Sequence, residues 1–560
     1  MRRLLVSALA ALTLSACAHK APAPADLVFW GGPVHTADDA RPTAEAVAVD
    51  DGRIVYVGDQ AGARRRVGPE TKIVDLKGAA LYPGFTDAHA HLRGIGEREL
   101  TLNLEGVASV AELTQRVRAR VEQAGPGPVI TGRGWIETHW PEKRFPTRDD
   151  LDRVAPDNPV LLVRADGHAL VANSAALKAA GIDGSTRAPE GGEILKDVAG
   201  RPTGMLIDAA MGLVSALRAA PGEGDRIRAL RKGHDVYSAY GWTGLHNMSV
   251  DWEDVQALEA LAANGEFPGL RVYNAVTPEA GRRLVQEGAR TAADGRVITR
   301  AIKYYVDGAL GSRGAALHAP YQDAPHTSGL VQLRKEEILP LYAQALRRGV
   351  QVTTHAIGDR GNTLVLDWYA EAFAAVPERE RGVADPRWRV EHAQVVAPGD
   401  IPRFAALGVI PSMQPSHAIG DLHFAPARLG DERLEGAYAW KSLVDAGSIV
   451  PGGSDAPVER GDPLIEFYAA VARRDLKGFA GPDWRPQQAV DRATALKMFT
   501  LWPAYASFRE KELGSITVGK RADLTVFSLD LMTAEEAQIP GAKALMTVVD
   551  GRIAHRADGW

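Results

Sequence analysis

Short β-rich runs separated by turn residues occur at both ends of the chain. Asp51-Gly52 lies between two such runs near the N-terminus, and Asp550-Gly551 lies between two more near the C-terminus. An Asp-Gly pair in this setting is the strongest short-range signal for a β-hairpin. Neither end is long enough to bury a core alone. We therefore predict that residues 27–82 and 505–558 fold together as one small composite β-sandwich.

Between these ends, short apolar runs alternate with longer helical stretches rich in Ala, Leu, Glu and Arg. Residues 301–306 and 351–355 are examples of the apolar runs, and residues 335–347 and 396–407 are examples of the helices. Strands that alternate with helices indicate a parallel sheet. Several such units in one domain fit a barrel better than an open sheet. The predicted fold class is therefore α/β, with a (β/α)8 TIM barrel over residues 83–504.

The first residues are typical of an export signal. A basic start precedes the apolar run Leu4–Leu14, which is too short for a membrane-spanning helix but suits a secretory signal. The run ends in Leu14-Ser15-Ala16-Cys17, which resembles the lipobox of bacterial lipoproteins. A plain signal peptide with an incidental cysteine is the alternative. We predict a lipoprotein signal peptide at 1–16, and a lipidated Cys17 with an extended tether at 17–26.

Composition narrows the classes of function and the location. The apolar fraction is 45%, the charged fraction 24% and the net charge −5, as in an ordinary soluble globular domain. No basic block longer than Arg64–Arg66 occurs, so we expect no nucleic-acid partner. Cys17 is the single cysteine, which excludes an intrachain disulfide and a multi-cysteine metal site. Ala18 follows it, which favours a lipid anchor on the periplasmic face of the outer membrane. The expected partners are a small-molecule substrate, this lipid anchor and a second copy in a homodimer.

The strongest local motif is the pair of histidines at 89 and 91. Side chains at i and i+2 point to the same side of a strand, so His89 and His91 can reach one ion. Imidazole is a common ligand of zinc and similar metals. Two surface histidines in a loop are the alternative.

Three further residues end apolar runs in separate units of the predicted barrel. They are His355, His392 and Asp455. Each alone has an ordinary explanation, a hydrogen-bonded core histidine or a helix N-cap. Strand ends of a barrel, however, converge on one mouth, where active sites lie. Together with His89 and His91 they predict a metal site in which Asp455 is both a ligand and the catalytic proton acceptor.

Lys303 lies inside an apolar run, where a buried charged lysine is costly. A solvent-facing lysine or an ion pair with Asp307 would explain it. The functional interpretation is a lysine carboxylated by CO2, whose new carboxylate bridges two metal ions.

These motifs together resemble the amidohydrolase superfamily, and within it amidohydrolase family 3, the branch of the YtcJ-like proteins and N-substituted formamide deformylase. The resemblance covers about residues 26–556. Its segments are 78–91, 306–313, 354–359, 391–393, 453–457 and 513–524. It implies one or two divalent metal ions, with zinc expected. It places His89 and His91 on the first barrel strand and carboxylated Lys303 on the fourth. His355, His392 and Asp455 fall on the fifth, sixth and eighth.

The resemblance also implies an inserted α+β domain. His91 and Lys303 are far too distant in sequence for the three β/α units that should separate them. We predict an insertion at about residues 100–210. His168, within it, is a candidate substrate-binding residue, with a structural hydrogen bond as the alternative. Arg313 is a second candidate, with an ion pair to an acid as the alternative.

The predicted reaction is hydrolysis of a C–N bond in a small molecule, an amide, N-substituted formamide or cyclic amide. A metal ion lowers the pKa of water, and Asp455 takes the proton and passes it to the leaving amine. Ester or lactone hydrolysis at the same centre is one alternative. A binding or regulatory lipoprotein without catalysis is the other.

Overall fold

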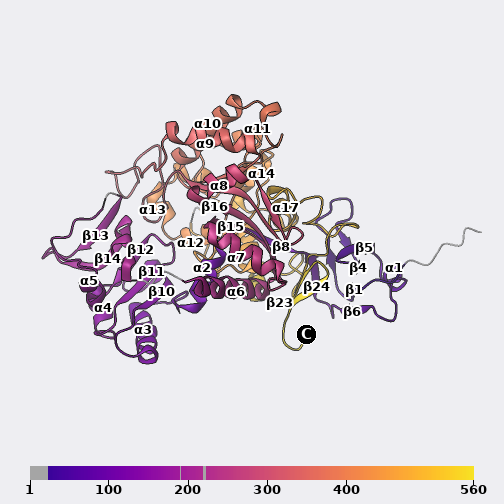
Figure 1. The fold of residues 1–560 in the computed structure, drawn as a ribbon, viewed down its shortest axis with the longest axis horizontal. Coiled ribbons are helices and arrows are strands. Elements are labelled where there is room, and N and C mark those ends of the chain that lie inside the picture. The colour runs from indigo at the N-terminus through magenta and orange to yellow at the C-terminus, as the bar shows by residue number, and fades with distance from the viewer. Residues whose placement is uncertain (1–22, 190, 218–221, 483) are drawn as a thin grey trace, which may run out of the picture.

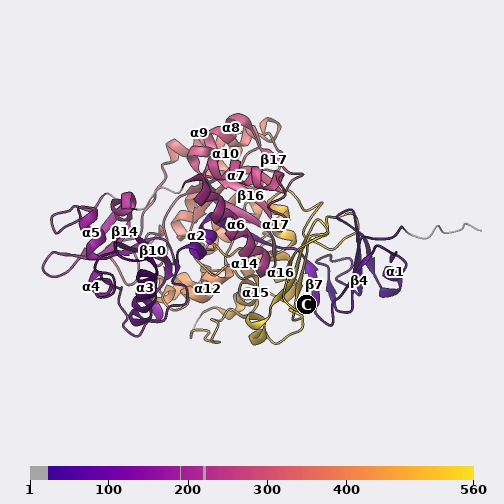
Figure 2. The same ribbon diagram turned by 60° about the horizontal axis from the view of Figure 1, so that its bottom comes forward.

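The computed structural model describes residues 23–560, apart from 190, 218–221 and 483. Cys17, the predicted signal peptide and most of the predicted tether lie outside the described residues. The inserted sheet lies at one end of the molecule, the barrel in the middle and the β-sandwich at the other end (Figure 1), and a view turned by 60° shows the same order (Figure 2). Of the helices described, none combines the length and the apolar character needed to cross a membrane.

The central sheet is a nearly closed barrel of parallel strands. Their order is β8-β15-β16-β18-β19-β20-β21, so each barrel strand lies beside the next one along the chain. The α/β class and the barrel are therefore confirmed. The strands are β8 (Phe85–Ala90), β15 (Trp242–Val250), β16 (Arg271–Val276), β18 (Val297–Tyr305), β19 (Gln351–Ala356), β20 (Arg389–His392) and β21 (Ile410–Ser412).

An irregular segment, residues 451–455, occupies the place of the eighth strand. On one side the Met413 N–H donates to the Pro451 carbonyl at 3.1 Å; on the other the Ala88 N–H donates to Gly452 at 3.0 Å. The segment thus links β21 to β8 without forming a regular strand. Its proline and its two glycines explain this, because proline has no N–H to donate and glycine weakens a strand.

Helices follow the barrel strands and cover the outside of the sheet. The helix predicted at 335–347 is α9 (Lys335–Arg348). The helix predicted at 396–407 begins later, as α11 (Ile401–Leu407), after a 3-10 turn over Pro398–Asp400. Pro402 fits this start, because proline is tolerated in the first turn of a helix. Other helices include α2 (Leu92–Leu100), α6 (Glu223–Tyr240), α7 (Trp252–Ala263), α8 (Pro278–Glu287), α10 (Asp359–Ala375), α12 (Pro415–Asp421) and α15 (Pro463–Ala472).

Strands from both ends of the chain build the β-sandwich. One sheet has the order β5-β4-β1-β6, and the other joins C-terminal to N-terminal strands in the order β24-β23-β22-β7-β2-β3. Phe29, Val47, Leu524 and Met546 share one core between them. The N-terminal strands are β1 (Leu27–Trp30), β2 (Val34–His35), β3 (Thr43–Ala44), β4 (Ala46–Asp50), β5 (Arg53–Gly58), β6 (Lys72–Asp75) and β7 (Ala80–Pro83). The C-terminal strands are β22 (Leu524–Phe527), β23 (Ala544–Val549) and β24 (Arg552–Arg556).

The segment between β8 and β15 carries a separate mixed sheet of order β13-β14-β12-β11-β10-β9. Apolar clusters lie on both of its faces, and α3 (Val110–Ala124), α4 (Arg148–Asp152) and α5 (Ser174–Ala179) pack against them. The strands are β9 (Leu102–Asn103), β10 (Ile130–Trp135), β11 (Val160–Arg164), β12 (Ala169–Ala172), β13 (Gly192–Lys196) and β14 (Pro202–Asp208). We call this part the insert.

Candidate metal centre

A cavity of about 970 Å³ opens at the carboxyl ends of the barrel strands, and the insert forms part of its wall. A cavity in this position is where barrel enzymes carry their active sites. All six residues predicted as metal ligands line it: His89, His91, Lys303, His355, His392 and Asp455.

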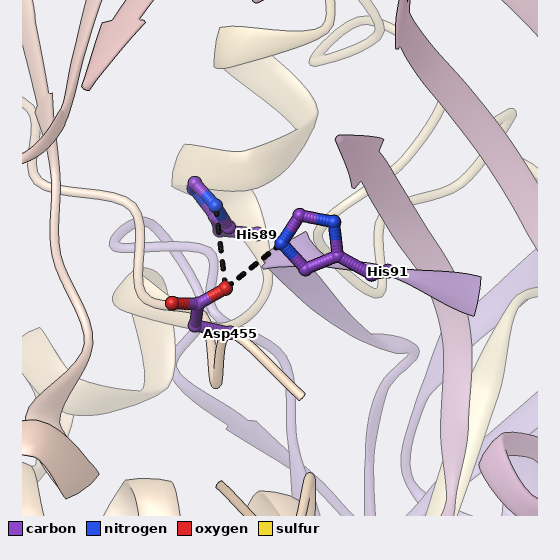
Figure 3. A group of neighbouring side chains, drawn as sticks. All are labelled: His89, His91 and Asp455. Carbon is purple, nitrogen blue, oxygen red and sulfur yellow. Dashed lines mark hydrogen bonds and ion pairs between the residues drawn. The ribbon is translucent and has the colours of Figure 1, made fainter. Parts of the chain in front are cut away.

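His89, His91 and Asp455 form one compact group of potential ligands. Figure 3 shows both imidazoles turned toward the same carboxylate oxygen. His91 Nε2 lies 3.0 Å and His89 Nε2 lies 3.5 Å from Asp455 Oδ1. Each residue offers one atom within 4.8 Å of the others, a spacing at which one cation can contact all of them. The two histidines lie close together because the chain passes directly from β8 into α2: His89 lies near the end of β8, and His91 is the N-cap of α2.

A second group shares Asp455 with two other histidines, His392 and His417. His417 Nε2 lies 3.7 Å from Asp455 Oδ2, and the rings of His392 and His417 are stacked. Among the described residues, this buried Nε2 atom has no hydrogen-bond partner. A buried nitrogen without a partner beside a carboxylate suits a metal ligand.

His417 was not among the residues predicted from the sequence. It lies on α12, directly after the three-residue strand β21. So short a strand leaves no apolar run to mark its end. The remaining signal is the succession of Pro415, Ser416 and His417 after Gln414, in the position where a seventh strand should end.

Hydrogen bonds to Nδ1 turn the Nε2 atoms of three histidines toward the centre. The acceptors are Glu391 Oε2 for His89 at 2.6 Å, the Met248 carbonyl for His91 at 3.0 Å and Gln414 Oε1 for His392 at 2.8 Å. An imidazole that donates from Nδ1 keeps its Nε2 lone pair for a metal. Each ring is thus held in the form that a ligand requires.

Arg389 fixes Glu391 in turn. Its Nε lies 2.7 Å from Glu391 Oε1, and both side chains are fully buried. Burial raises the pKa of Glu391, but Arg389 and His89 outweigh it and hold that pKa far below its usual range. Glu391 is therefore a carboxylate that orients His89.

Lys303 lies on β18, the fourth barrel strand, with Nζ 3.3 Å from His89 Nε2. Burial lowers the pKa of Lys303 to about 8. In the described part of the chain no carboxylate lies within ion-pair distance of it. Asp307, the alternative partner of Lys303, instead accepts hydrogen bonds from the backbone N–H groups of Ala316, Ile357 and Gly358.

His355, on β19, lies beside the two groups without belonging to either. Its ring centre is 4.6 Å from that of His392, while its Nε2 is 3.4 Å from Asp307 Oδ1. The structure thus brings it to the cavity wall, on the side of His392.

The two candidate substrate contacts have different positions. His168 lines the cavity from the insert, and its Nδ1 pairs with Asp208 Oδ1 at 2.8 Å. Arg313 does not line the cavity, and its guanidinium pairs with Asp323 at 2.8 Å. The ion pair is the contact that the alternative interpretation of Arg313 predicts.

Comparison with known proteins identifies the family. Residues 72–555 match the amidohydrolase family over nearly the whole chain. The chain belongs to this family. Our amidohydrolase is 36% identical over 537 residues to the putative amidohydrolase YtcJ of Bacillus subtilis, and the match covers 94% of this chain and 99% of that protein.

Two further comparisons agree. N-substituted formamide deformylase of Arthrobacter pascens is 32% identical to this amidohydrolase, covering 95% of this chain and 99% of that protein. The crystal structure of an uncharacterized metal-dependent hydrolase from Pyrococcus horikoshii matches with a TM-score of 0.74 at 27% identity, covering 91% of this chain and 99% of that chain. The chain is thus a member of a superfamily of metal-dependent hydrolases.

The donor set fits a divalent metal. Each group of this amidohydrolase combines two imidazoles with one carboxylate, the ligand types found in catalytic zinc sites. Burial raises the pKa of Asp455, but the neighbouring His89, His91 and His392 hold it well below its usual range. Asp455 is therefore an ionised carboxylate facing four imidazoles.

Proposed function

We propose that this amidohydrolase hydrolyses a C–N bond of a small-molecule amide, and that N-substituted formamides are the first class to test. The observation that carries the proposal is Asp455, a carboxylate that lines the cavity and is shared by two pairs of histidines. The relative named N-substituted formamide deformylase suggests the class of substrate.

The residues of the site have two roles, binding of a cation and transfer of a proton. Five residues would hold one or two divalent ions, for which we expect zinc: His89, His91, His392, His417 and Asp455. His355 and a carboxylated Lys303, which line the same cavity, are the remaining proposed ligands. Such an ion supplies a Lewis acid that polarises the substrate carbonyl and lowers the pKa of water. The Asp455 carboxylate accepts a proton as water adds to the carbonyl carbon. It then donates that proton to the leaving nitrogen as the C–N bond breaks, so that an acid and an amine are released.

We further propose that Lys303 is carboxylated. Its neutral Nζ attacks CO2 and releases a proton, which leaves a carbamate with a negative charge beside His89. The low pKa of Lys303 supports this, because it increases the neutral fraction. Supplying 13C-labelled bicarbonate should give one carbamate carbon resonance from the native protein and none from Lys303→Met. The same spectrum from both proteins would reject the modification.

A substrate panel tests the reaction class. Purified zinc-loaded protein is assayed with N-formyl amines, longer amides, esters and lactones, before and after metal removal by a chelator. We expect metal-dependent release of amine, with the highest kcat/KM among the amides. Faster turnover of esters or lactones would move the assignment to that alternative. No turnover of any class by fully loaded protein would favour a binding or regulatory role.

We also propose that the protein is exported and anchored to the outer membrane through a lipid on Cys17. The support is the signal-like start of the chain, which lies outside the described residues. Metabolic labelling with a radioactive fatty acid should label the native protein and leave Cys17→Ala unlabelled. Equal labelling of both would contradict the anchor.

A further inference from the structure

Arg133 brings a positive charge from the insert into the catalytic cavity. It lies on β10, outside the barrel, yet its side chain lines the same cavity as Asp455. Of all carboxylates, that of Asp455 acts most strongly on its charge. Arg133 from the insert and Asp455 from the barrel therefore line one cavity, although they belong to different parts of the fold.

The guanidinium of Arg133 has few partners. Its Nη2 donates to the Ala165 carbonyl at 3.1 Å, whereas its Nε is buried with no hydrogen-bond partner among the described residues. Within the same described residues, no carboxylate lies close enough to form an ion pair with it. Arg133 thus has unused N–H donors and no ion-pair partner among these residues, and Asp455, Asp166 and Glu97 act on its charge only from a greater distance.

Other arginines that line the cavity are neutralised. Arg164 pairs with Glu137 and Asp166, and Arg93 pairs with Asp251 and Asp254. Arg460 pairs with Glu105 at 2.6 Å. The lack of a partner is therefore particular to Arg133 and does not follow from its position in the cavity wall.

The backbone beside Arg133 fixes the position of its guanidinium. Gly167 adopts a φ of +76°, and a Cβ at this position would lie 3.3 Å from Arg133 Nη2. The turn thus packs closely against the guanidinium, and its carboxylate, Asp166, pairs with Arg164 and not with Arg133. A partly buried cation with unmet donors is costly unless a ligand satisfies it, and the planar guanidinium matches a carboxylate with two parallel hydrogen bonds.

We propose that Arg133 binds a carboxylate of the substrate, so that the amide cleaved at the barrel mouth is an N-acylated amino acid or a similar acidic amide. This inference rests on the proposed function and narrows its substrate class. It assigns binding of the acid group to the insert and bond cleavage to the barrel. Arg133 is then a specificity-determining residue.

A matched pair of substrates tests the preference. N-formylphenylalanine and N-formylphenethylamine differ only in the carboxylate. For the native zinc-loaded enzyme we expect kcat/KM to be about 10- to 100-fold higher for the acid, the range of one hydrogen-bonded charge pair. Arg133→Met should remove this preference by lowering only the value for the acid, and Arg133→Lys should keep part of it. Arg153→Met is the control, because it removes a charge from the same insert at a side chain that is 75% exposed.

Equal losses for both substrates in Arg133→Met, or no preference in the native enzyme, would overturn the proposal. Binding gives a second measurement that does not require turnover. By calorimetry, phenylacetate should bind the native protein at least about tenfold more tightly than phenylacetamide, and Arg133→Met should lose the difference. That result without hydrolysis of either formamide would count against the proposed reaction and still support the carboxylate site. Equal phenylacetate affinity in both proteins would reject the site.

Discussion

Asp455 is the residue on which both ligand groups depend. Its two carboxylate oxygens face different histidines, Oδ1 toward His89 and His91 and Oδ2 toward His417. Asp455→Asn keeps the shape but removes the negative charge and the proton acceptor. We expect kcat to fall by about 100-fold or more, together with the bound zinc per chain. Amine release and elemental analysis measure the two effects.

The control is Asp445→Asn, at a side chain that is 59% exposed and pairs with Lys441 on the surface. It should leave both zinc content and kcat unchanged. Near-normal kcat in Asp455→Asn with full zinc would remove Asp455 from the reaction.

Gln414 is a positioning residue, because it contacts His392 and would act on a bound cation only through that ring. Its Oε1 accepts the hydrogen bond from His392 Nδ1. Gln414→Leu removes that acceptor and should weaken zinc affinity by about 10- to 100-fold. Gln414→Glu restores an acceptor and should recover most of the affinity. Competition with a fluorescent chelator measures the zinc affinity. Equal zinc affinities in Gln414→Leu and Gln414→Glu would show that the hydrogen bond to His392 does not orient the ring.

At the scale of elements, local patterns predicted some strands and missed others. His355 is the penultimate residue of β19 and His392 the last residue of β20, and each was visible as an apolar run that stops at a histidine. By contrast, β21 has three residues, and segment 451–455 is irregular. Their places are set by hydrogen bonds to strands distant in sequence. Sequence therefore indicated the position of Asp455 but neither its irregular backbone nor the presence of His417.

The irregular segment 451–455 approaches β8 closely at Gly453, where a larger side chain would change the distance between them. A Cβ on Gly453 would lie 2.5 Å from the His89 backbone nitrogen and 2.8 Å from Asp87 Oδ1. Gly453→Ala should push the segment away from His89 and lower both zinc affinity and kcat by about tenfold or more. Gly399→Ala is the control, because no atom lies within 4 Å of the added carbon. Unchanged zinc affinity in Gly453→Ala would show that the segment can shift without disturbing the site.

At the scale of the whole molecule, the candidate catalytic residues and the contacts with the sandwich lie at opposite ends of the barrel strands. The cavity lies at the carboxyl ends, whereas the sandwich contacts the amino ends. The Gly84 N–H, just before β8, donates to the Asp523 carbonyl at 2.7 Å, and Arg271 begins β16. Such a division is common in barrel enzymes, in which the amino-terminal face contributes stability.

Arg271 forms a buried ion-pair link between the barrel and the sandwich. It pairs with Asp523 at 2.6 Å and with Asp550, and the side chains of Arg271 and Asp523 are 7% and 6% exposed. Removing one partner of a buried pair leaves an uncompensated charge. Asp523→Ala should therefore lower the free energy of unfolding by about 3 kcal/mol, at the lower end of the usual range because Asp550 remains.

Thermal unfolding and kinetics on the same samples separate the two faces of the barrel. Asp523→Ala should lower the unfolding midpoint and leave kcat and zinc content at 25 °C at native values, because its contacts lie at the far end of β16 from Asp455. Asp294→Ala, at an 86% exposed partner of Arg521, should change neither the midpoint nor kcat. A loss of kcat in fully folded Asp523→Ala would mean that strain at the amino ends reaches the metal centre, and that the sandwich helps to shape the site.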